Sequence, residues 1–458
     1  MNTATAGSLK LGLSIMMFLQ IFIWGAWFEL NFGYVGKGLG MSSNQQWYIF
    51  SAFNIGAVYA LFFGTQFADR RFSAEKFLAF SHLIGGLAIG GLFFVEKGWT
   101  TEISGNKIDL TFWVFFSLML IHSLFYVPTI SITNSIAFSH LKDPHNEFGR
   151  IRVWGTIGWI MASWPLIFIL VNWSKMPAFD SVGLADWIGS LFKAENALSG
   201  DEYRHASRYI YLIAAVASLL LAAFSLKLPH TPPKPPSESG GKLAWFESLK
   251  LLRKPFVLVL FVVTFIDAAV HQSFFVLTEQ FLTSKDVGIP SNWASPVMKI
   301  GQIAEIITMI FLGYVLKRLG WRWTMILGVL GHAARFAVFA YYPDKTAVIL
   351  INIVHGICYA FFFATVYIFI DEYFPKDARA SAQGLFNLLI LGIGPFAANF
   401  ACTRLSDEFA LARTKDGTPL LLDYPQVFLF PLVAAMVAAV LLLAFFHPPK
   451  IEDSNKST

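Results

Sequence analysis

The chain has 458 residues, of which 56% are hydrophobic and only 14% are charged. A soluble globular chain carries about 25% charged residues, so this chain has too little charge to cover a water-facing surface of its size. The composition excludes an ordinary cytosolic enzyme, a nucleic-acid-binding protein and a disordered scaffold. The net charge of +5 fits loops that face anionic lipid. The 2 cysteines, Cys358 and Cys402, lie in apolar stretches and indicate neither a disulfide framework nor a metal motif.

Long apolar stretches follow one another along the whole chain. A membrane-spanning helix needs about 20 largely apolar residues, and twelve stretches of roughly that length are present. They show no alternation of period two, which argues against a transmembrane β-barrel. We predict spanning helices over residues 10–34, 45–68, 75–95, 111–139, 151–172, 207–228, 255–282, 295–316, 322–341, 346–371, 380–403 and 425–447.

The basic residues are distributed unevenly between alternate loops. If the N-terminus is cytoplasmic, most of the 34 Lys and Arg fall in cytoplasmic segments, and those on the opposite side lie mainly in two long loops. Short cytoplasmic loops are enriched in Lys and Arg. We therefore predict that the N- and C-termini are both cytoplasmic.

A proline- and glycine-rich segment separates the sixth and seventh predicted spans. It contains the sequence LPHTPPKPPSESGGK, in which Pro removes backbone donors and Gly loosens the chain. It divides the chain into an N-terminal six-helix bundle (1–228), a cytoplasmic linker (229–254) and a C-terminal six-helix bundle (255–458). Gly64 and Gly313 precede basic loops at matching places in the two bundles. This repetition predicts an all-α transporter built from two bundles.

One face of the fifth predicted span carries polar and aromatic residues. Arg152, Thr156 and Trp159 follow the i, i+4, i+7 spacing of a helix face. Polar groups inside a span are costly unless they face a cavity or a partner, so we interpret this face as lining a cavity. The alternative for Arg152 is a loop charge whose side chain reaches the membrane interface.

The eighth predicted span contains Gln302 and Glu305 on one face of an otherwise apolar helix. A carboxylate at that depth suits a group that gains and loses a proton during transport. The alternative is a buried partner for a neighbouring helix.

Two further spans contain polar residues. Gln272 and His271 lie in span seven, where Asp267 is a second candidate carboxylate, and His355 and Tyr359 lie one turn apart in span ten. An amide donates and accepts hydrogen bonds at once, which suits a base edge. The alternative is polar contact between helices. Aromatic faces with Gln and Glu favour a pocket for a flat, polar solute.

Motifs of catalysis are missing from the sequence. It contains no GxSxG, no Gly-rich phosphate loop with Lys, no HExxH and no paired CxxC. We expect no enzyme activity, no cofactor and no metal. The energy for transport would come from an ion gradient, or the movement would be passive.

Four segments together resemble the nucleoside:H⁺ symporter family of the major facilitator superfamily. These segments are FLQIFIWGAW at 18–27, IRVWGTIG at 151–158, QIAE at 302–305 and RASAQG at 379–384. The resemblance extends over most of the chain. It implies the major facilitator fold and a bacterial inner-membrane permease.

The resemblance also implies a set of functional residues. The implied nucleoside-binding residues are Arg152, Thr156, Trp159, Gln272, Gln302, Glu305, His355 and Tyr359. Glu305 would carry the proton, and Gly64, Asp69 and Arg70 would belong to the loop that switches conformation. The chain departs from the family at Ala360, where a membrane carboxylate is absent, and at Phe275, where the family has Asn.

These expectations describe a monomeric carrier that lies in membrane lipid and moves nucleosides inward with protons by alternating access. It would bind no nucleic acid. Trp159 and Tyr359 would stack on the base, while Gln272 and Gln302 would bond the base or ribose. A carrier for a sugar, amino acid or drug keeps the same fold and is the first alternative. A nucleoside receptor would need a signalling domain, for which the tail after Pro448 is too short, and a membrane-embedded transferase would need a nucleophile–base pair.

Overall fold

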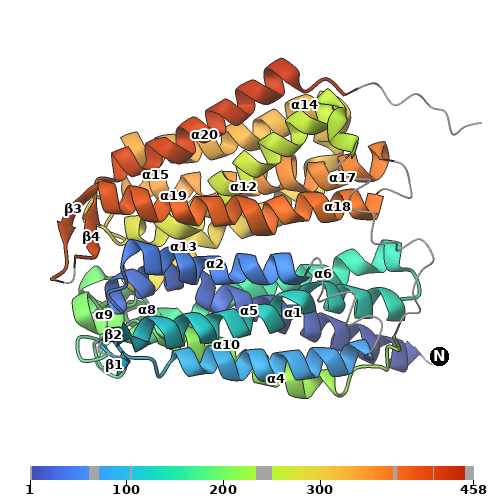
Figure 1. Cartoon of the computed structure of the whole chain (residues 1–458). Helices are drawn as coiled ribbons and strands as arrows, with labels where there is room; N and C mark the ends of the chain where they lie inside the picture. Colours follow the sequence, from blue (N-terminus) through green and yellow to red (C-terminus); the bar gives the residue numbers. More distant parts are fainter. Residues whose placement is uncertain are drawn as a thin grey trace, which may run out of the picture. The chain divides into compact units, whose positions relative to one another are not determined.

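The computed structural model describes residues 3–60, 72–103, 106–233, 250–374, 379–415 and 417–448. These residues are mainly helical, as predicted, with two short antiparallel hairpins that the sequence did not predict (Figure 1). Contacts group the chain into two compact units. Unit 1 comprises residues 1–235, 274–300 and 399–427, and unit 2 comprises residues 236–273, 301–398 and 428–458.

Among the described residues, 8 helical segments are long and apolar enough to cross a membrane. Shorter or less apolar helices, Ser43–Tyr59, Ala74–Leu92 and Pro144–Met161, lie within or overlap the predicted spans at 45–68, 75–95 and 151–172, of which residues 61–68 lie outside the described part of the chain. The structure therefore supports a multi-pass membrane protein, and the count of twelve spans stays a prediction. The candidate spans are Gly7–Gly38, Leu110–His140, Gly200–Ser225, Pro255–Leu282, Ser291–Tyr341, Lys345–Tyr373, Ala382–Glu408 and Tyr424–Phe445.

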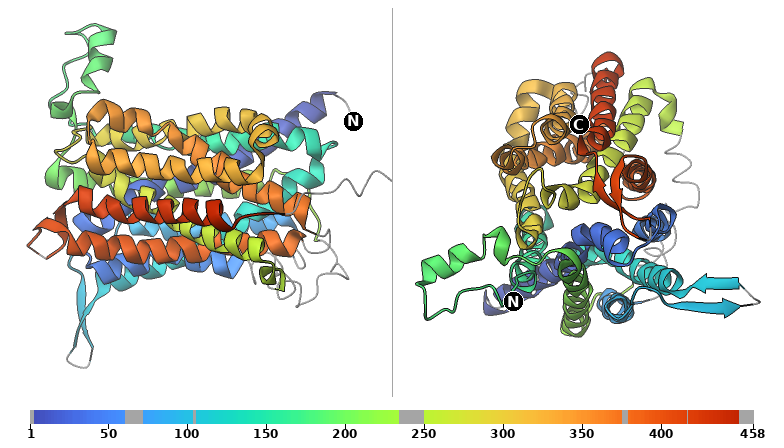
Figure 2. Two further views of the ribbon diagram at one scale, coloured as in Figure 1. Left: turned by 90° about the horizontal axis from the view of Figure 1, so that it is seen from above. Right: turned by 90° about the vertical axis from the view of Figure 1, so that its left-hand side faces the viewer.

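Unit 1 consists mainly of long helices from the first part of the chain. Helix α4 packs on α5 and α10, α1 packs on α6 and α10, and α2 packs on α5. The β1–β2 hairpin extends from the ends of α4 and α5 (Figure 2). The elements are α1 (Thr3–Gly33), η1 (Tyr34–Gly38), α2 (Ser43–Tyr59), α4 (Ala74–Leu92), β1 (Thr100–Ile103), β2 (Asn106–Asp109), α5 (Leu110–His140), α6 (Pro144–Met161), α7 (Trp164–Ile169), α8 (Leu184–Ser190), η3 (Ala194–Asn196), α9 (Gly200–Ala206) and α10 (Tyr209–Ser225).

Segments from the second half of the sequence complete unit 1. They are the end of α12 (Pro255–Leu282), α13 (Ser291–Met298), the end of α19 (Gly394–Glu408), and the hairpin of β3 (Ala410–Arg413) and β4 (Pro419–Leu422). Helix α13 packs on α7, and β4 packs on η1.

Buried polar side chains join four helices of unit 1. His82 Nε2 lies 2.8 Å from Gln20 Oε1, and His82 Nδ1 lies 3.0 Å from the Ser218 hydroxyl. Gln20 Nε2 in turn donates to the Thr129 hydroxyl at 2.9 Å. Because each of these groups has a partner, the cluster holds α1, α4, α5 and α10 together.

Two glycines of α6 allow α1 to approach closely. A Cβ at Gly158 would lie 2.2 Å from the backbone oxygen of Phe18, and one at Gly155 would lie 3.0 Å from Ile21. The glycines of the IRVWGTIG segment are therefore required by packing. Near the start of the same helices, Lys10 Nζ lies 2.6 Å from Glu147 Oε1, and the ammonium holds the pKa of this half-buried carboxyl below its usual range.

Unit 2 is built from the remaining helices. They are η4 (Leu251–Arg253), the start of α12, α14 (Ile300–Tyr341), α15 (Lys345–Ile351), α16 (Val354–Cys358), η5 (Tyr359–Ala364), α17 (Thr365–Tyr373), α18 (Arg379–Asn387), η6 (Leu388–Ile393), the start of α19 and most of α20 (Tyr424–Phe445). The segments η5 and η6 are π-helical turns that continue neighbouring α-helices. Such turns are frequent at functional sites because they rotate the side chains that follow.

Helix α14 is interrupted at Gly320. This residue has φ 71°, a left-handed conformation that glycine adopts at little cost. The break separates the predicted spans 295–316 and 322–341 and confirms that two helices meet there. On the first of them, large apolar side chains are exposed, including Ile307, Ile310 and Phe311. Such a face suits contact with lipid.

We expect Gly158→Ala to destabilise the protein, because its new methyl group would collide with the backbone of α1. Overpacking of this kind costs about 1–3 kcal/mol. The thermal unfolding of the purified protein in detergent measures the effect. Gly149→Ala is the matched control in α6, where a Cβ meets nothing within 4 Å. Equal melting temperatures for the two variants would contradict the packing argument.

Candidate functional site

The predicted residues of α6 lie in unit 1. Arg152 and Thr156 are half-buried, and Trp159 is buried. The Arg152 side chain folds over its own helix, so that Nη1 lies 2.6 Å from the position of a Cβ at Gly155. Gly155 thus makes room for both α1 and the guanidinium.

Trp159 lies in an aromatic cluster. Its ring centroid is 5.3 Å from that of Trp24, 6.1 Å from that of Phe28 and 6.1 Å from that of Phe275. Lys299 Nζ lies over the Trp159 ring, 4.0 Å from its centroid. A base that stacks on Trp159 would therefore need the opposite face of the indole or a movement of the lysine.

The lysine also belongs to a buried ion pair that the sequence analysis missed. Lys299 Nζ donates to Glu29 Oε1 at 2.7 Å, and the Ser295 hydroxyl donates to Glu29 Oε2 at 2.6 Å. The side chains of Glu29 and Lys299 are 1% and 2% exposed. The sequence feature that could have indicated this pair was the presence of one acidic and one basic residue, Glu29 and Lys299, each inside or beside an apolar stretch.

Other polar contacts in unit 1 join the two halves of the sequence. The Tyr203 hydroxyl donates to Glu279 Oε1, and Asn399 Nδ2 donates to Asn54 Oδ1 at 3.0 Å. A Cβ at Gly33, where α1 ends, would lie 2.7 Å from Glu279 Oε2, so this glycine allows the carboxylate to approach.

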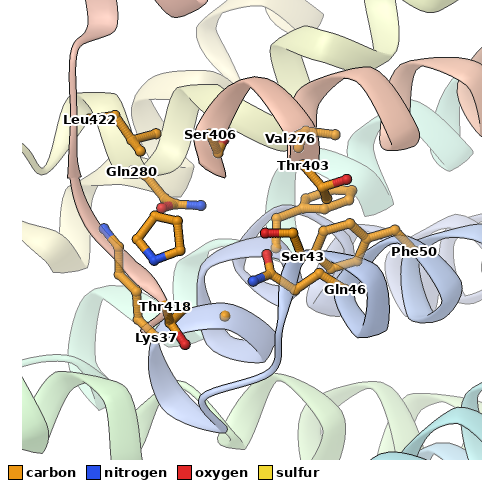
Figure 3. A pocket seen from close by; sticks show the side chains of 13 residues that line it. Lys37, Ser43, Gln46, Phe50, Val276, Gln280, Thr403, Ser406, Thr418 and Leu422 are labelled. Atoms are coloured by element: carbon orange, nitrogen blue, oxygen red, sulfur yellow. The ribbon is translucent and has the colours of Figure 1, made fainter. Parts of the chain in front are cut away.

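A small pocket with many polar side chains lies in unit 1, where η1, α2, α12, α19 and β4 come together. Figure 3 shows Lys37, Gln46, Gln280 and Thr418 among its lining residues. None of the predicted nucleoside-binding residues is among those that line it. The sequence analysis did not single out this pocket.

The other predicted binding residues lie in unit 2. Gln302 of α14 and His355 of α16 are brought together, with the Gln302 amide nitrogen 3.2 Å from His355 Nε2. The close approach depends on glycine, since a Cβ at Gly301 would lie 2.6 Å from His355 Cβ. Tyr359 begins the π-helical turn η5, and its ring centroid is 6.3 Å from that of His271.

Glu305 and Gln272 differ in burial. Glu305 is half-buried, one turn after Gln302 on α14, and Gln272 of α12 is 7% exposed. A Cβ at Gly356 would lie 2.5 Å from the backbone nitrogen of Glu305, so α16 and α14 are in close contact at the depth of this carboxylate. Gly64, Asp69 and Arg70, the predicted switch loop, lie outside the described residues.

The model of the family described as nucleoside H⁺ symporter matches residues 7–192 and 177–451. The chain belongs to this family. It is 31% identical to the Escherichia coli protein YegT over 97% of this chain and 95% of that protein. It is 27% identical to the xanthosine permease of Escherichia coli, with 92% and 94% covered, and 27% identical to the nucleoside permease NupG of Escherichia coli, with 96% of each chain covered.

Solved structures share the fold. A crystal structure of the nucleoside transporter NupG matches with a TM-score of 0.75 at 25% identity, over 96% of this chain and 100% of that one. A bacterial homologue of the lysosomal transporter Spinster, in an inward-facing conformation, matches with a TM-score of 0.71 at 15% identity, over 98% and 100% of the two chains. The fold is thus that of major facilitator transporters.

We expect Lys299→Met to destabilise the protein, because it leaves the Glu29 carboxylate buried without its counter-charge. Breaking a buried ion pair from one side costs about 3–5 kcal/mol, whereas replacing both partners is often neutral. The double variant Glu29→Gln, Lys299→Met should therefore recover most of the lost stability. Cys358 and Cys402 are buried and form no disulfide, so the onset of their reaction with a thiol-reactive dye reports unfolding. A double variant less stable than Lys299→Met would contradict this account.

Proposed function

We propose that this protein imports nucleosides together with protons across the bacterial inner membrane by alternating access. The observation that carries the proposal is the match to the nucleoside H⁺ symporter family along residues 7–451. Buried polar and charged side chains in the apolar helices support it, since such groups are costly in a membrane and mark transport pathways.

The proposed architecture has twelve spanning helices in two bundles, residues 1–228 and 255–458, with a cytoplasmic linker at 229–254. Both termini are cytoplasmic, and the protein works as a monomer. The two bundles rock about a central substrate site, as in other transporters built from repeats.

The proposed nucleoside contacts come from both bundles. Trp159 and Tyr359 stack on the base, Gln272 and Gln302 bond the base or ribose, and Glu305 bonds ribose hydroxyls and exchanges the proton. Arg152, Thr156 and His355 complete the set. Coupling follows if protonation changes the affinity for nucleoside or the balance between outward- and inward-open states.

With the N-terminus in the cytoplasm, the end of α1 lies toward the outer side of the membrane. The ion pair of Glu29 and Lys299 then joins the outer parts of the two proposed bundles, as do the contacts of Tyr203 with Glu279 and of Asn54 with Asn399. We infer that access from outside requires these contacts to separate.

Uptake of labelled uridine and adenosine tests the function. Expression in a cell that lacks nucleoside transport should raise uptake, and a protonophore should abolish accumulation. We expect Glu305→Gln to concentrate nucleoside less than the wild type under the same proton gradient, because an amide cannot exchange the proton. Glu372→Gln, which changes an exposed acid at the end of α17, is the matched control and should behave like the wild type. Accumulation by Glu305→Gln at the wild-type level would remove Glu305 from coupling.

A second prediction concerns the aromatic contact. Stacking of a base on an aromatic ring is worth about 1–3 kcal/mol, so Tyr359→Ala should raise the KM of uptake roughly tenfold or more. Tyr359→Phe keeps the ring and should stay within about a factor of three of the wild type. Similar KM values for the alanine and phenylalanine variants would exclude stacking at this position.

A further inference from the structure

Five ionisable side chains come together in unit 2, beside residues proposed to bind nucleoside. Asp267 and His271 come from α12, His332 and Arg335 from α14, and His355 from α16. We call these residues the Asp–His–Arg network. Asp267, His332 and Arg335 are 0% exposed, and buried charges in spanning helices mark proton or ion pathways. The proposed nucleoside contacts leave the presence of Asp267 and Arg335 unexplained.

Arg335 fixes the hydrogen-bonding state of two histidines. Its Nη1 lies 2.8 Å from His355 Nδ1, and its Nη2 lies 2.9 Å from His332 Nδ1. A guanidinium donates hydrogen bonds and cannot accept them. Both Nδ1 atoms must therefore accept, so both imidazoles are neutral and carry their proton on Nε2. An extra proton on either ring would break a hydrogen bond to Arg335.

The proton of His332 points toward Asp267. His332 Nε2 lies 3.7 Å from Asp267 Oδ2, and neither carboxylate oxygen has a hydrogen-bond partner among the described residues. The carboxylate is thus buried next to a positive charge without the full set of donors that a permanent anion needs. Asp267 is the member of the network that can take up a proton without losing a hydrogen bond of its own.

Several helices supply the surroundings of Asp267. The neighbouring titratable or charged groups are His271 on α12, His332 and Arg335 on α14, and His355 and the Cys358 thiol on α16. Gly394 of α19 packs against Ala268 and adds no charge. Arg335 therefore supplies the positive charge that balances an ionised Asp267.

The network ends on a residue of the proposed nucleoside site. His355 Nε2 carries a proton, so the Gln302 amide must turn its oxygen toward it, and the amide nitrogen is left to donate elsewhere. Arg335 therefore determines, through His355, the direction in which the side-chain amide N–H groups of Gln302 point. A change in the position of Arg335 would alter the hydrogen bond that a nucleoside receives.

We propose that Asp267 binds a proton that is cotransported with the nucleoside, and that His332, Arg335 and His355 transmit its charge state to Gln302. The inference rests on the proposed function. An O–H bond forms at the carboxylate when the proton arrives from water on the outer side, and it breaks when the proton passes to water on the inner side. Protonation removes the charge that balances Arg335, whose hydrogen bonds to the two histidines then rearrange. The carboxylate lies in the same unit as Ala360, where the family has its acid.

Proteoliposomes with the full chain test the proposal. With the membrane potential held at zero, each cotransported proton multiplies the steady accumulation of labelled uridine by about ten per unit of pH difference. We expect Asp267→Asn to lower the slope of log accumulation against pH difference by about one, while exchange of uridine without a gradient continues. Asp267→Glu keeps a carboxylate and should restore the slope.

The matched control is His122→Asn. His122 is also 0% exposed, and its Nδ1 lies 2.9 Å from the backbone oxygen of Gly85, a contact that the asparagine amide can keep. Its slope should equal that of the wild type. A wild-type slope in Asp267→Asn would overturn the inference, whereas a wild type that does not respond to the pH gradient would overturn the proposed function instead.

If Asp267→Asn shows no exchange, His332→Asn decides the matter. The asparagine oxygen still accepts from Arg335, but the N–H that faces Asp267 is lost, so the carboxylate takes up its proton more easily. In the wild type, the KM for uridine exchange should rise with pH as Asp267 loses its proton. In His332→Asn the midpoint of this rise should move to higher pH. A midpoint equal to that of the wild type would overturn the inference.

Discussion

A carboxylate and an ammonium in a medium of low dielectric constant are stable only as a closely paired set. Glu29 and Lys299 satisfy this condition with a contact of 2.7 Å across a separation of 270 residues, and Ser295 and the face of Trp159 complete their surroundings. The pair therefore helps to fix the position of residues 274–300 within unit 1. The aromatic cluster around Trp159 and the contact of α13 with α7 are consistent with this arrangement.

The buried polar groups of the protein fall into two kinds. Gln20, His82 and Thr129 have partners throughout and hold helices in a fixed arrangement. Asp267 Oδ2 lies 3.7 Å from His332 Nε2, and neither carboxylate oxygen has a hydrogen-bond partner among the described residues. A saturated cluster resists change because every alteration loses a bond, whereas a cluster with spare capacity can exist in two charge states at similar free energy. Polar groups with a full set of partners therefore stabilise the fold, whereas a polar group with unused acceptors suits the proton binding of a symporter.

The sequence predicted the apolar helices and the separation of the spans 295–316 and 322–341, between which the structure has the break at Gly320, because these follow from local composition. It also placed Gln302 and His355 among the site residues, which the structure brings into contact. It did not predict the pairing of Glu29 with Lys299, since partners far apart in the chain leave no periodic signal. The contact of His332 on α14 with Asp267 on α12 was missed for the same reason, and the π-helical turn at Tyr359 was not predicted.

The approach of Gly158 to the Phe18 backbone has a mechanical consequence. At Gly158 no side chain separates the backbones of α1 and α6, so the two helices are in close contact there. We expect these two helices to move as one rigid body. Glu29 on α1 and Trp159 on α6 would then keep their spacing through a transport cycle. A movement of the Trp159 ring would move the Glu29 carboxylate with it.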